Sequence, residues 1–268
     1  MRYGIDVAIL GDLAEPAHLV TLAREAEAAG WDAVLVWDHL AFTWGMPSVD
    51  PWVTLAAAAQ VTSHIRLGTA VTAVARHRPE SLAQTVATLD RLSGGRAILG
   101  AGLGGVEQEF TAFGSARPGR VVLDEALDVM TSLWSGEEVH HRGAYYTVDG
   151  VGLAPLPLQR PRVPVWIGGT APGALQRAAR WDGWIVAGDD REGRMTLSPD
   201  SLATQAGELR RYRANAGDLE VAVIGVSEPG SSVQAYADAG ATWWLEHLHS
   251  HRGSMEWLVR RVKAGPPV

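Results

Sequence analysis

Short runs of β-branched and aromatic residues alternate along the chain with longer segments in which apolar residues recur every three or four positions. The short runs are typical of buried strands, and the longer segments of amphipathic helices. Eight strands are expected, at residues 3–9, 33–37, 65–71, 96–101, 163–167, 183–187, 219–225 and 241–245. Helices are expected between and after them, at residues 17–29, 51–62, 80–92, 120–135, 171–181, 200–216, 231–239 and 253–264.

Alternation of strand and helix predicts a parallel sheet with right-handed crossovers, and eight such units predict closure. The expected fold is therefore α/β, a single (β/α)8 TIM barrel that occupies residues 1–268 as one domain. Residues 136–162 interrupt the alternation with Gly, Pro and two short β-prone runs. We interpret this segment as an excursion that carries a small hairpin over one end of the barrel.

Composition narrows the function classes. The length of 268 residues suits one closed barrel, and 23 Lys and Arg against 30 Asp and Glu give a net charge of −7. This balance argues against a nucleic-acid or anionic-membrane partner. The absence of Cys excludes disulfides, thiolate nucleophiles and Cys-ligated zinc. No segment reads as a signal peptide or a membrane span, so we expect a cytoplasmic protein.

Residues that follow the strands of a closed barrel converge on one mouth, where barrel enzymes carry out their chemistry. Trp37-Asp38-His39 at the end of the second strand is the sharpest candidate. An imidazole there can exchange a proton near neutral pH, and the neighbouring carboxylate can orient it or bind a cofactor. The alternative is structural: Asp38 caps the following loop and His39 is a satisfied polar residue.

Two glycine segments also reach the mouth. Gly168-Gly169-Thr170 forms a strand–glycine–helix junction that suits a phosphate. A tight turn without a ligand explains it equally well, and barrel phosphate sites more often follow strands seven and eight. Residues 100–105 lack the helix and the acidic residue of a dinucleotide fingerprint. We interpret them as a loop that passes close to a flat ligand, or as the hinge of a lid.

Other polar residues carry weaker signals. His247, His249 and His251 alternate, but without carboxylate or Cys support a surface loop is favoured over a metal site, and no metal is expected. Residues 76–78 (Arg-His-Arg) can clamp an anion or form a solvated turn. Trp44, in the loop after His39, can wall a planar cofactor or substrate.

Several blocks resemble the luciferase-like monooxygenase superfamily, the bacterial-luciferase-type barrels that use FMN or the deazaflavin F420. The matching blocks are AREAEAAGWDAVLVWDH (23–39), VDPWVTLAAAAQVTSHIRLGTAVT (49–72), PESLAQTVATLDRLSGGRAILGAGLGG (79–105), EF (109–110), VPVWIGG (163–169) and AARWDGW (178–184). They span nearly the full chain in the right order. The chain is shorter than luciferase and lacks its late insert, which leaves the active-site lid and the substrate open.

The resemblance implies roles for particular residues. His39 stands near the redox-active ring as a catalytic residue with Glu109, whose alternative role is a helix cap. Asp38 lies beside the cofactor, and Ala73-Val74 forms a non-proline cis peptide that supports the ring. Gly168, Gly169 and Thr170 meet the cofactor phosphate. The two substrate-pocket candidates are Trp44 and Glu246, the latter from its position at the end of the eighth strand.

The leading hypothesis is an oxidoreductase that transfers hydride to or from a small-molecule substrate, or activates oxygen. F420 is favoured over FMN because the Asp38–His39 pair resembles F420-dependent members, and a homodimer is expected from the resemblance. The alternative is a non-catalytic flavin- or deazaflavin-binding protein with a degenerate site. A cofactor-free isomerase or aldolase is disfavoured in its Schiff-base form, because the only Lys is Lys263, in the last helix.

Overall fold

A closed barrel of parallel strands forms the centre of the computed structural model, which describes residues 1–40, 45–190, 192–213, 217–228 and 230–267. The barrel strands are β1 (Arg2–Val7), β2 (Ala33–Val36), β3 (Arg66–Thr69), β5 (Ala97–Gly102), β8 (Val165–Gly168), β9 (Gly183–Ala187), β10 (Glu220–Gly225) and β11 (Trp243–Leu248). Neighbours pair in the order β3-β2-β1-β11-β10-β9-β8-β5, and pairing of β3 with β5 closes the ring. The two-residue strand β4 (Thr72–Ala73) continues beside β5. The predicted (β/α)8 barrel is confirmed.

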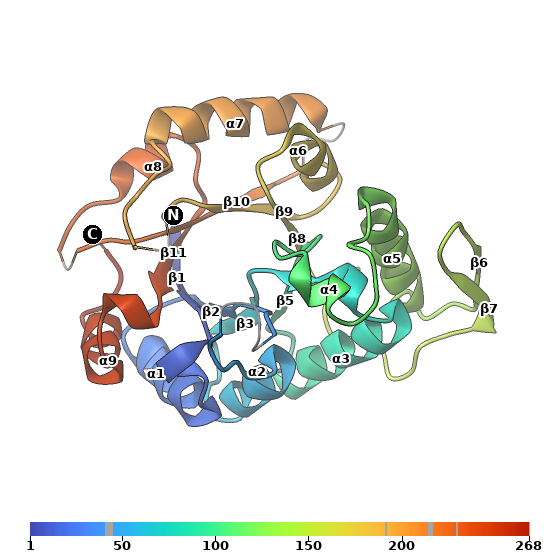
Figure 1. Ribbon diagram of the computed structural model, residues 1–268, viewed down its shortest axis with the longest axis horizontal. Coiled ribbons are helices and arrows are strands. Elements are labelled where there is room, and N and C mark those ends of the chain that lie inside the picture. Colours follow the sequence, from blue (N-terminus) through green and yellow to red (C-terminus); the bar gives the residue numbers. More distant parts are fainter. Residues whose placement is uncertain (41–44, 191, 214–216, 229, 268) are drawn as a thin grey trace.

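Helices surround the barrel (Figure 1). They are α1 (Pro16–Ala28), α2 (Pro51–Ala59), α3 (Pro79–Leu92), α4 (Gln108–Thr111), α5 (Arg120–Leu133), α6 (Pro172–Ala178), α7 (Pro199–Tyr212), α8 (Gln234–Asp238) and α9 (Met255–Lys263). Short 3-10 turns lie at Gly11–Leu13, Val74–Arg76 and Ser250–Arg252. Residues at the first turn determine where α2 begins. The Asp50 side chain accepts a hydrogen bond from the backbone N–H of Val53 at 2.8 Å, and Pro51 occupies the first helical position. None of the described helices is long and apolar enough to span a membrane.

Alternation along each strand divides the apolar residues between two cores. In β2, Val34 and Val36 pack outward against the helices. Ala33 and Leu35 point into the barrel, where they meet residues from five other strands, among them Ile98, Trp166, Ile185, Ala222, Trp243 and Leu245. The barrel interior is thus filled by these side chains.

One strand boundary changes the location of two candidate residues. The eighth strand was predicted to end at residue 245, whereas β11 extends to Leu248 and includes Glu246 and His247. Its last residues pair with β1, with Asp6 opposite His247 and Val7 opposite Leu248. Glu246 and His247 therefore point to opposite sides of the barrel wall.

The excursion at residues 136–162 contains the predicted hairpin, formed by β6 (Val139–Arg142) and β7 (Thr147–Val151). It lies beyond α5 at the edge of the molecule rather than over an end of the barrel (Figure 1). Glu125 of α5 holds it there, because its carboxylate accepts from the backbone N–H groups of Ala144, Tyr145 and Tyr146. The hairpin is thus attached to an outer helix.

Gly100 of β5 lies where the barrel wall has no room for a side chain. A Cβ there would stand 1.9 Å from the Thr69 carbonyl oxygen. We expect Gly100→Ala to lower the free energy of unfolding by about 1–3 kcal/mol, because overpacking displaces the backbone. Urea denaturation measures this. The control Gly207→Ala in α7, where a Cβ meets nothing within 4 Å, should gain about 0.4–1 kcal/mol. Equal midpoints for Gly100→Ala and the unsubstituted chain would contradict the prediction.

Candidate active site

Two connected cavities open at the carboxyl ends of the barrel strands. The central cavity, of about 280 Å³, is lined by Trp37, Asp38, His39, Ala70, Val71, Ala73, Gly104, Gly105, Ala187, Asp189, Asp190, Ile224 and His247. The second, here called the arginine cavity, measures about 440 Å³ and includes Gly102, Gly168, Gly169, Thr170, Arg117 and Arg177 in its lining. Ala70, Val71, Gly104, Gly105, Ala187 and Ile224 line both. Together they form one elongated cleft.

His39 and Glu109, the predicted catalytic pair, lie in contact although 70 residues separate them. The His39 Nδ1 atom lies 3.0 Å from a Glu109 carboxylate oxygen, which also accepts from the backbone N–H of Leu40 at 2.7 Å. Glu109 is 1% exposed, whereas His39 lines the central cavity. Because the carboxylate accepts the Nδ1–H proton, proton exchange with a ligand falls to Nε2. Glu109 is therefore a positioning residue for His39.

Arg76 joins the two acidic candidates beneath His39. Its guanidinium donates to Glu109 at 2.7 Å and forms an ion pair with the Asp38 carboxylate. His77 lies 3.2 Å from the other Asp38 oxygen. From the sequence, residues 76–78 are expected either to clamp an anion or to form a solvated turn. The structure instead places the guanidinium of Arg76 between two carboxylates, where it offsets the repulsion between Asp38 and Glu109.

The predicted cis peptide is displaced by three residues. The bond between Ala70 and Val71 is cis, rather than that between Ala73 and Val74. Ala73 lines the central cavity, but Val74 is fully buried in the outer core, so its assignment to cofactor contact is wrong. Val71 lines the cleft, whereas Val74 does not. Side chains at Gly100, Gly102 and Gly168 would all approach Val71, at 3.2 Å or less. These glycines therefore leave the room that Val71 occupies at the cleft.

Gly168, Gly169 and Thr170 line the arginine cavity, as the phosphate-site hypothesis requires. Gly169 has a φ of 116°, which favours glycine. Arg117 lies on the same cavity, and Arg177 forms two hydrogen bonds with Asp124, at 2.7 and 2.9 Å. The glycines allow close approach of a ligand to the backbone, and the guanidinium of Arg117 supplies positive charge. This end of the cleft suits an anionic group.

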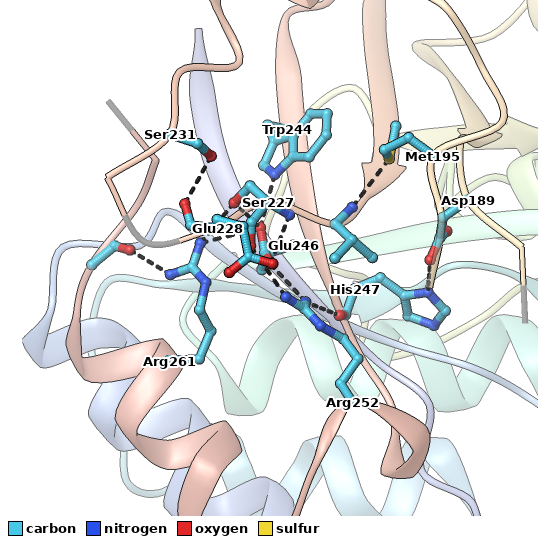
Figure 2. Close-up of polar contacts among 12 residues, drawn as sticks. Asp189, Met195, Ser227, Glu228, Ser231, Trp244, Glu246, His247, Arg252 and Arg261 are labelled. Atoms are coloured by element: carbon cyan, nitrogen blue, oxygen red, sulfur yellow. Dashed lines mark hydrogen bonds and ion pairs between the residues drawn. The ribbon is translucent and has the colours of Figure 1, made fainter. Parts of the chain in front are cut away.

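Glu246, a predicted substrate-pocket residue, lines neither of these two cavities. It has no exposed surface and pairs with Arg252 at 2.6 Å and Arg261 at 3.2 Å. Ser227 Oγ and Trp244 Nε1 also donate to it (Figure 2). Alternation along β11 turns Glu246 toward α9, away from the mouth, so its assignment to the substrate pocket is wrong. Trp44, the other substrate-pocket candidate, lies outside the described residues.

A third cavity, the histidine cavity, of about 230 Å³, shares Trp37 and His247 with the central cavity. Its remaining lining consists of Ala8, Leu10, Met46, His249, Ser250 and His251. The rings of Trp37 and His247 stack at 5.0 Å. Burial would lower the pKa of His247, but hydrogen bonding to Asp189 and the charges of Asp6 and Asp189 outweigh it and raise that pKa. Burial raises the pKa of Asp6, beneath Trp37, to about 7.

The sequence pattern does not predict the pairing of Asp189 with His247, because 58 residues separate them. The Nδ1 atom of His247 lies 2.8 Å from Asp189 Oδ2. His249 is buried as well, and burial lowers its pKa to about 4. The prediction that His247 and His249 belong to a surface loop is therefore wrong. The alternation of side chains along a strand could have predicted the inward position of His247. Residues 243 and 245 point into the barrel, and residue 247 follows them on the same face.

Comparison with known proteins is consistent with this architecture. The family described as luciferase-like monooxygenase matches residues 4–256. An uncharacterized protein of Mycobacterium tuberculosis is 38% identical over 180 residues, which cover 66% of this chain and 61% of that protein. The F420-dependent hydroxymycolic acid dehydrogenase of the same organism is 34% identical over 211 residues, covering 76% of this chain and 58% of that protein. The chain thus spans about three fifths of the length of these relatives.

Among solved structures, the coenzyme F420-dependent tetrahydromethanopterin reductase from Methanopyrus kandleri superposes with a TM-score of 0.78. The superposition covers 98% of this chain and 97% of that one, at 18% sequence identity. At this identity the likeness concerns the fold.

Proposed function

The chain belongs to the luciferase-like monooxygenase family, and from this membership and the site geometry we propose that it is an F420-dependent oxidoreductase acting on a small molecule. One observation carries the proposal: the His39–Glu109 pair borders one end of an elongated, glycine-lined cleft whose other end contains Arg117. The mycobacterial F420-dependent dehydrogenase among the relatives supports F420 over FMN as the cofactor.

The cleft fits an F420-type cofactor in shape and in chemistry. Gly104 and Gly105 let the backbone approach a flat ring, and Val71 with Ile224 supplies apolar contact. Gly168, Gly169 and Thr170, with Arg117, would hold the anionic part. When bound, F420 supplies the acceptor or donor of the hydride. The cofactor would thus lie along the whole cleft, with its redox-active end beside His39.

The described residues of the chain supply proton transfer and exclusion of water. His39 would take a proton from a substrate hydroxyl at Nε2 when that substrate is oxidised, or return it in the reverse direction. Glu109 fixes the tautomer through Nδ1 and stabilises the imidazolium that forms. Arg76 keeps Glu109 and Asp38 in place by forming an ion pair with each carboxylate. Trp37, Ala187 and Ile224 line the central cavity and limit access of water.

A non-catalytic cofactor-binding protein is the second candidate. It requires the cleft but not the aligned proton-transfer pair. The contact of His39 with the Glu109 carboxylate favours turnover over simple binding, since it orients an imidazole that lines the cleft for proton exchange, which binding alone does not require.

Gly105→Asp tests whether the cleft binds the cofactor. Gly105 lines the cleft, and a Cβ there meets nothing within 4 Å, so the protein has room for the first atom of a side chain. We expect F420 affinity to fall at least about tenfold, because a side chain at Gly105 takes the space in which the flat ring approaches the backbone, and covering its carboxylate with the ring costs desolvation free energy. Titration of F420 fluorescence, with FMN titrated in parallel, measures the change.

The control is Gly207→Asp on α7, which also meets nothing within 4 Å and lies outside the cleft. It should bind F420 as the unsubstituted chain does. Binding of FMN alone would replace F420 by FMN in the proposal. Failure of the unsubstituted chain to bind either cofactor, or equal affinity of the Gly105→Asp variant, would refute the assignment of the cleft.

A further inference from the structure

Three potential metal ligands meet between the central cavity and the histidine cavity. Asp189 follows β9, His247 lies in β11, and His249 comes directly after β11. One ligand atom from each residue lies within 4.8 Å of the other two. His247 is 4% exposed and His249 8% exposed, so this cluster is buried in the barrel mouth. Figure 2 shows the His247 ring turned toward Asp189.

The cluster contains a buried nitrogen atom without a hydrogen-bond partner. Among the described residues, none donates to or accepts from Nε2 of His249. The Nε2 atom of His249 faces the loop after β9, 3.3 Å from the point where a Cβ at Gly193 would stand. Buried polar atoms in native proteins normally have a partner, so an unsatisfied imidazole nitrogen in a polar cluster points to a missing one.

We propose that Asp189, His247 and His249 bind one divalent transition-metal cation of the zinc class. Two imidazoles and one carboxylate form a donor set that suits Zn²⁺ and its neighbours rather than Mg²⁺ or Ca²⁺. Adjacent ligands of a tetrahedral ion with bonds of about 2.1 Å lie about 3.4 Å apart, so the 2.8 Å between His247 Nδ1 and Asp189 Oδ2 has to widen slightly when the ion binds. The ion takes the place of the proton in that hydrogen bond, and the proton leaves to solvent.

Three protein ligands leave at least one coordination position open. Both His247 and His249 line the histidine cavity, so a small oxygen ligand such as water or a substrate hydroxyl has access to the ion from there. The sequence pattern alone lacked a carboxylate beside the alternating histidines. Asp189, 58 residues from His247, supplies it in the fold. His251, the third histidine of the run, lies outside the cluster.

Cobalt provides the test, because Co²⁺ binds zinc-type sites and its visible absorption reports its ligands, whereas d¹⁰ Zn²⁺ is silent. The purified full chain is freed of metal by a chelator and titrated with Co²⁺ without any added cofactor. We expect saturation at one Co²⁺ per chain with visible bands, and bleaching of these bands when Zn²⁺ is added. His249→Ala and Asp189→Asn should each weaken Co²⁺ binding at least about tenfold.

His251→Ala is the matched control, because His251 shares the histidine cavity and its ring lies 5.8 Å from that of His249. It should bind Co²⁺ with unchanged affinity. An equal loss in His251→Ala would indicate adventitious chelation by the histidine run and overturn the proposal. So would the absence of saturable binding to the unsubstituted chain, or unchanged binding in both ligand variants.

Thermal melting without metal checks that the variants fold, and Zn²⁺ should raise the melting temperature of the unsubstituted chain only in proportion to its binding. If a ligand variant does not melt cooperatively, the stoichiometry and spectrum of the unsubstituted chain decide the question. The measurement uses metal alone, so its failure would leave the F420 proposal intact.

Discussion

His39→Gln is expected to lower kcat/KM for F420-linked turnover by about 10²–10⁴-fold, the usual contribution of a positioned general acid or base. Gln keeps hydrogen-bonding capacity toward Glu109 but cannot exchange a proton near neutral pH. F420 affinity should change little, because the apolar and glycine lining of the cleft is untouched. Turnover is followed by F420 absorbance against a panel of alcohols, and binding by fluorescence.

His77→Gln provides the matched control for this prediction. His77 belongs to the same polar cluster, but it contacts Asp38 and not Glu109. Its replacement should cause a much smaller loss of turnover. If His39→Gln binds F420 and retains the rate of the unsubstituted chain, His39 is not the proton carrier. A loss confined to affinity would instead make His39 a cofactor-binding residue.

Glu246→Gln should lower the free energy of unfolding by roughly 3–5 kcal/mol, the cost of breaking a buried ion pair by removing one partner. Two guanidinium groups depend on this carboxylate: the side chains of Arg252 and Arg261 are 7% and 1% exposed. Neutralising Glu246 leaves both charges buried without their counter-charge. Urea denaturation followed by circular dichroism measures the loss.

Glu228→Gln is the control, since Glu228 is exposed and lies in the same region (Figure 2). A surface substitution of this kind changes stability by at most about 0.5 kcal/mol. A loss below about 1 kcal/mol in Glu246→Gln would show that Arg252 and Arg261 can be rehydrated without unfolding. Loss of substrate affinity with unchanged stability would restore Glu246 to the substrate pocket.

The order of strands and helices is determined by local pattern, so it was predictable. β9 occurs where expected, at residues 183–187. The helix α2 begins at Pro51, and the N-cap residue Asp50 followed by proline is the local signal for that start. These features depend on residues within one turn or one strand. Strand ends were less predictable: β11 continues past residue 245 because Glu246 and His247 pair with β1, and pairing with a distant strand has no local signal.

The site was predictable in its positions but not in its contacts. His39 and Gly168 lie on the cleft because strand ends converge in any closed barrel. The ion pairs of Arg76 with Asp38 and Glu109 join residues 38 and 33 positions apart, and only the folded chain brings them together. Likewise, the contact of Val71 with the cleft depends on glycines of β5 and β8 that are distant in sequence.

The closed α/β barrel and the edge at which its polar residues gather are predictable from the amino-acid sequence, because both follow from periodicity and strand order. Tertiary structure decided which of these residues face a ligand. Glu246 and His247 are neighbours in the chain, yet one is buried against two arginines and the other faces the mouth. Successive strand residues point to opposite faces, so the register of β11 against β1 separates their roles.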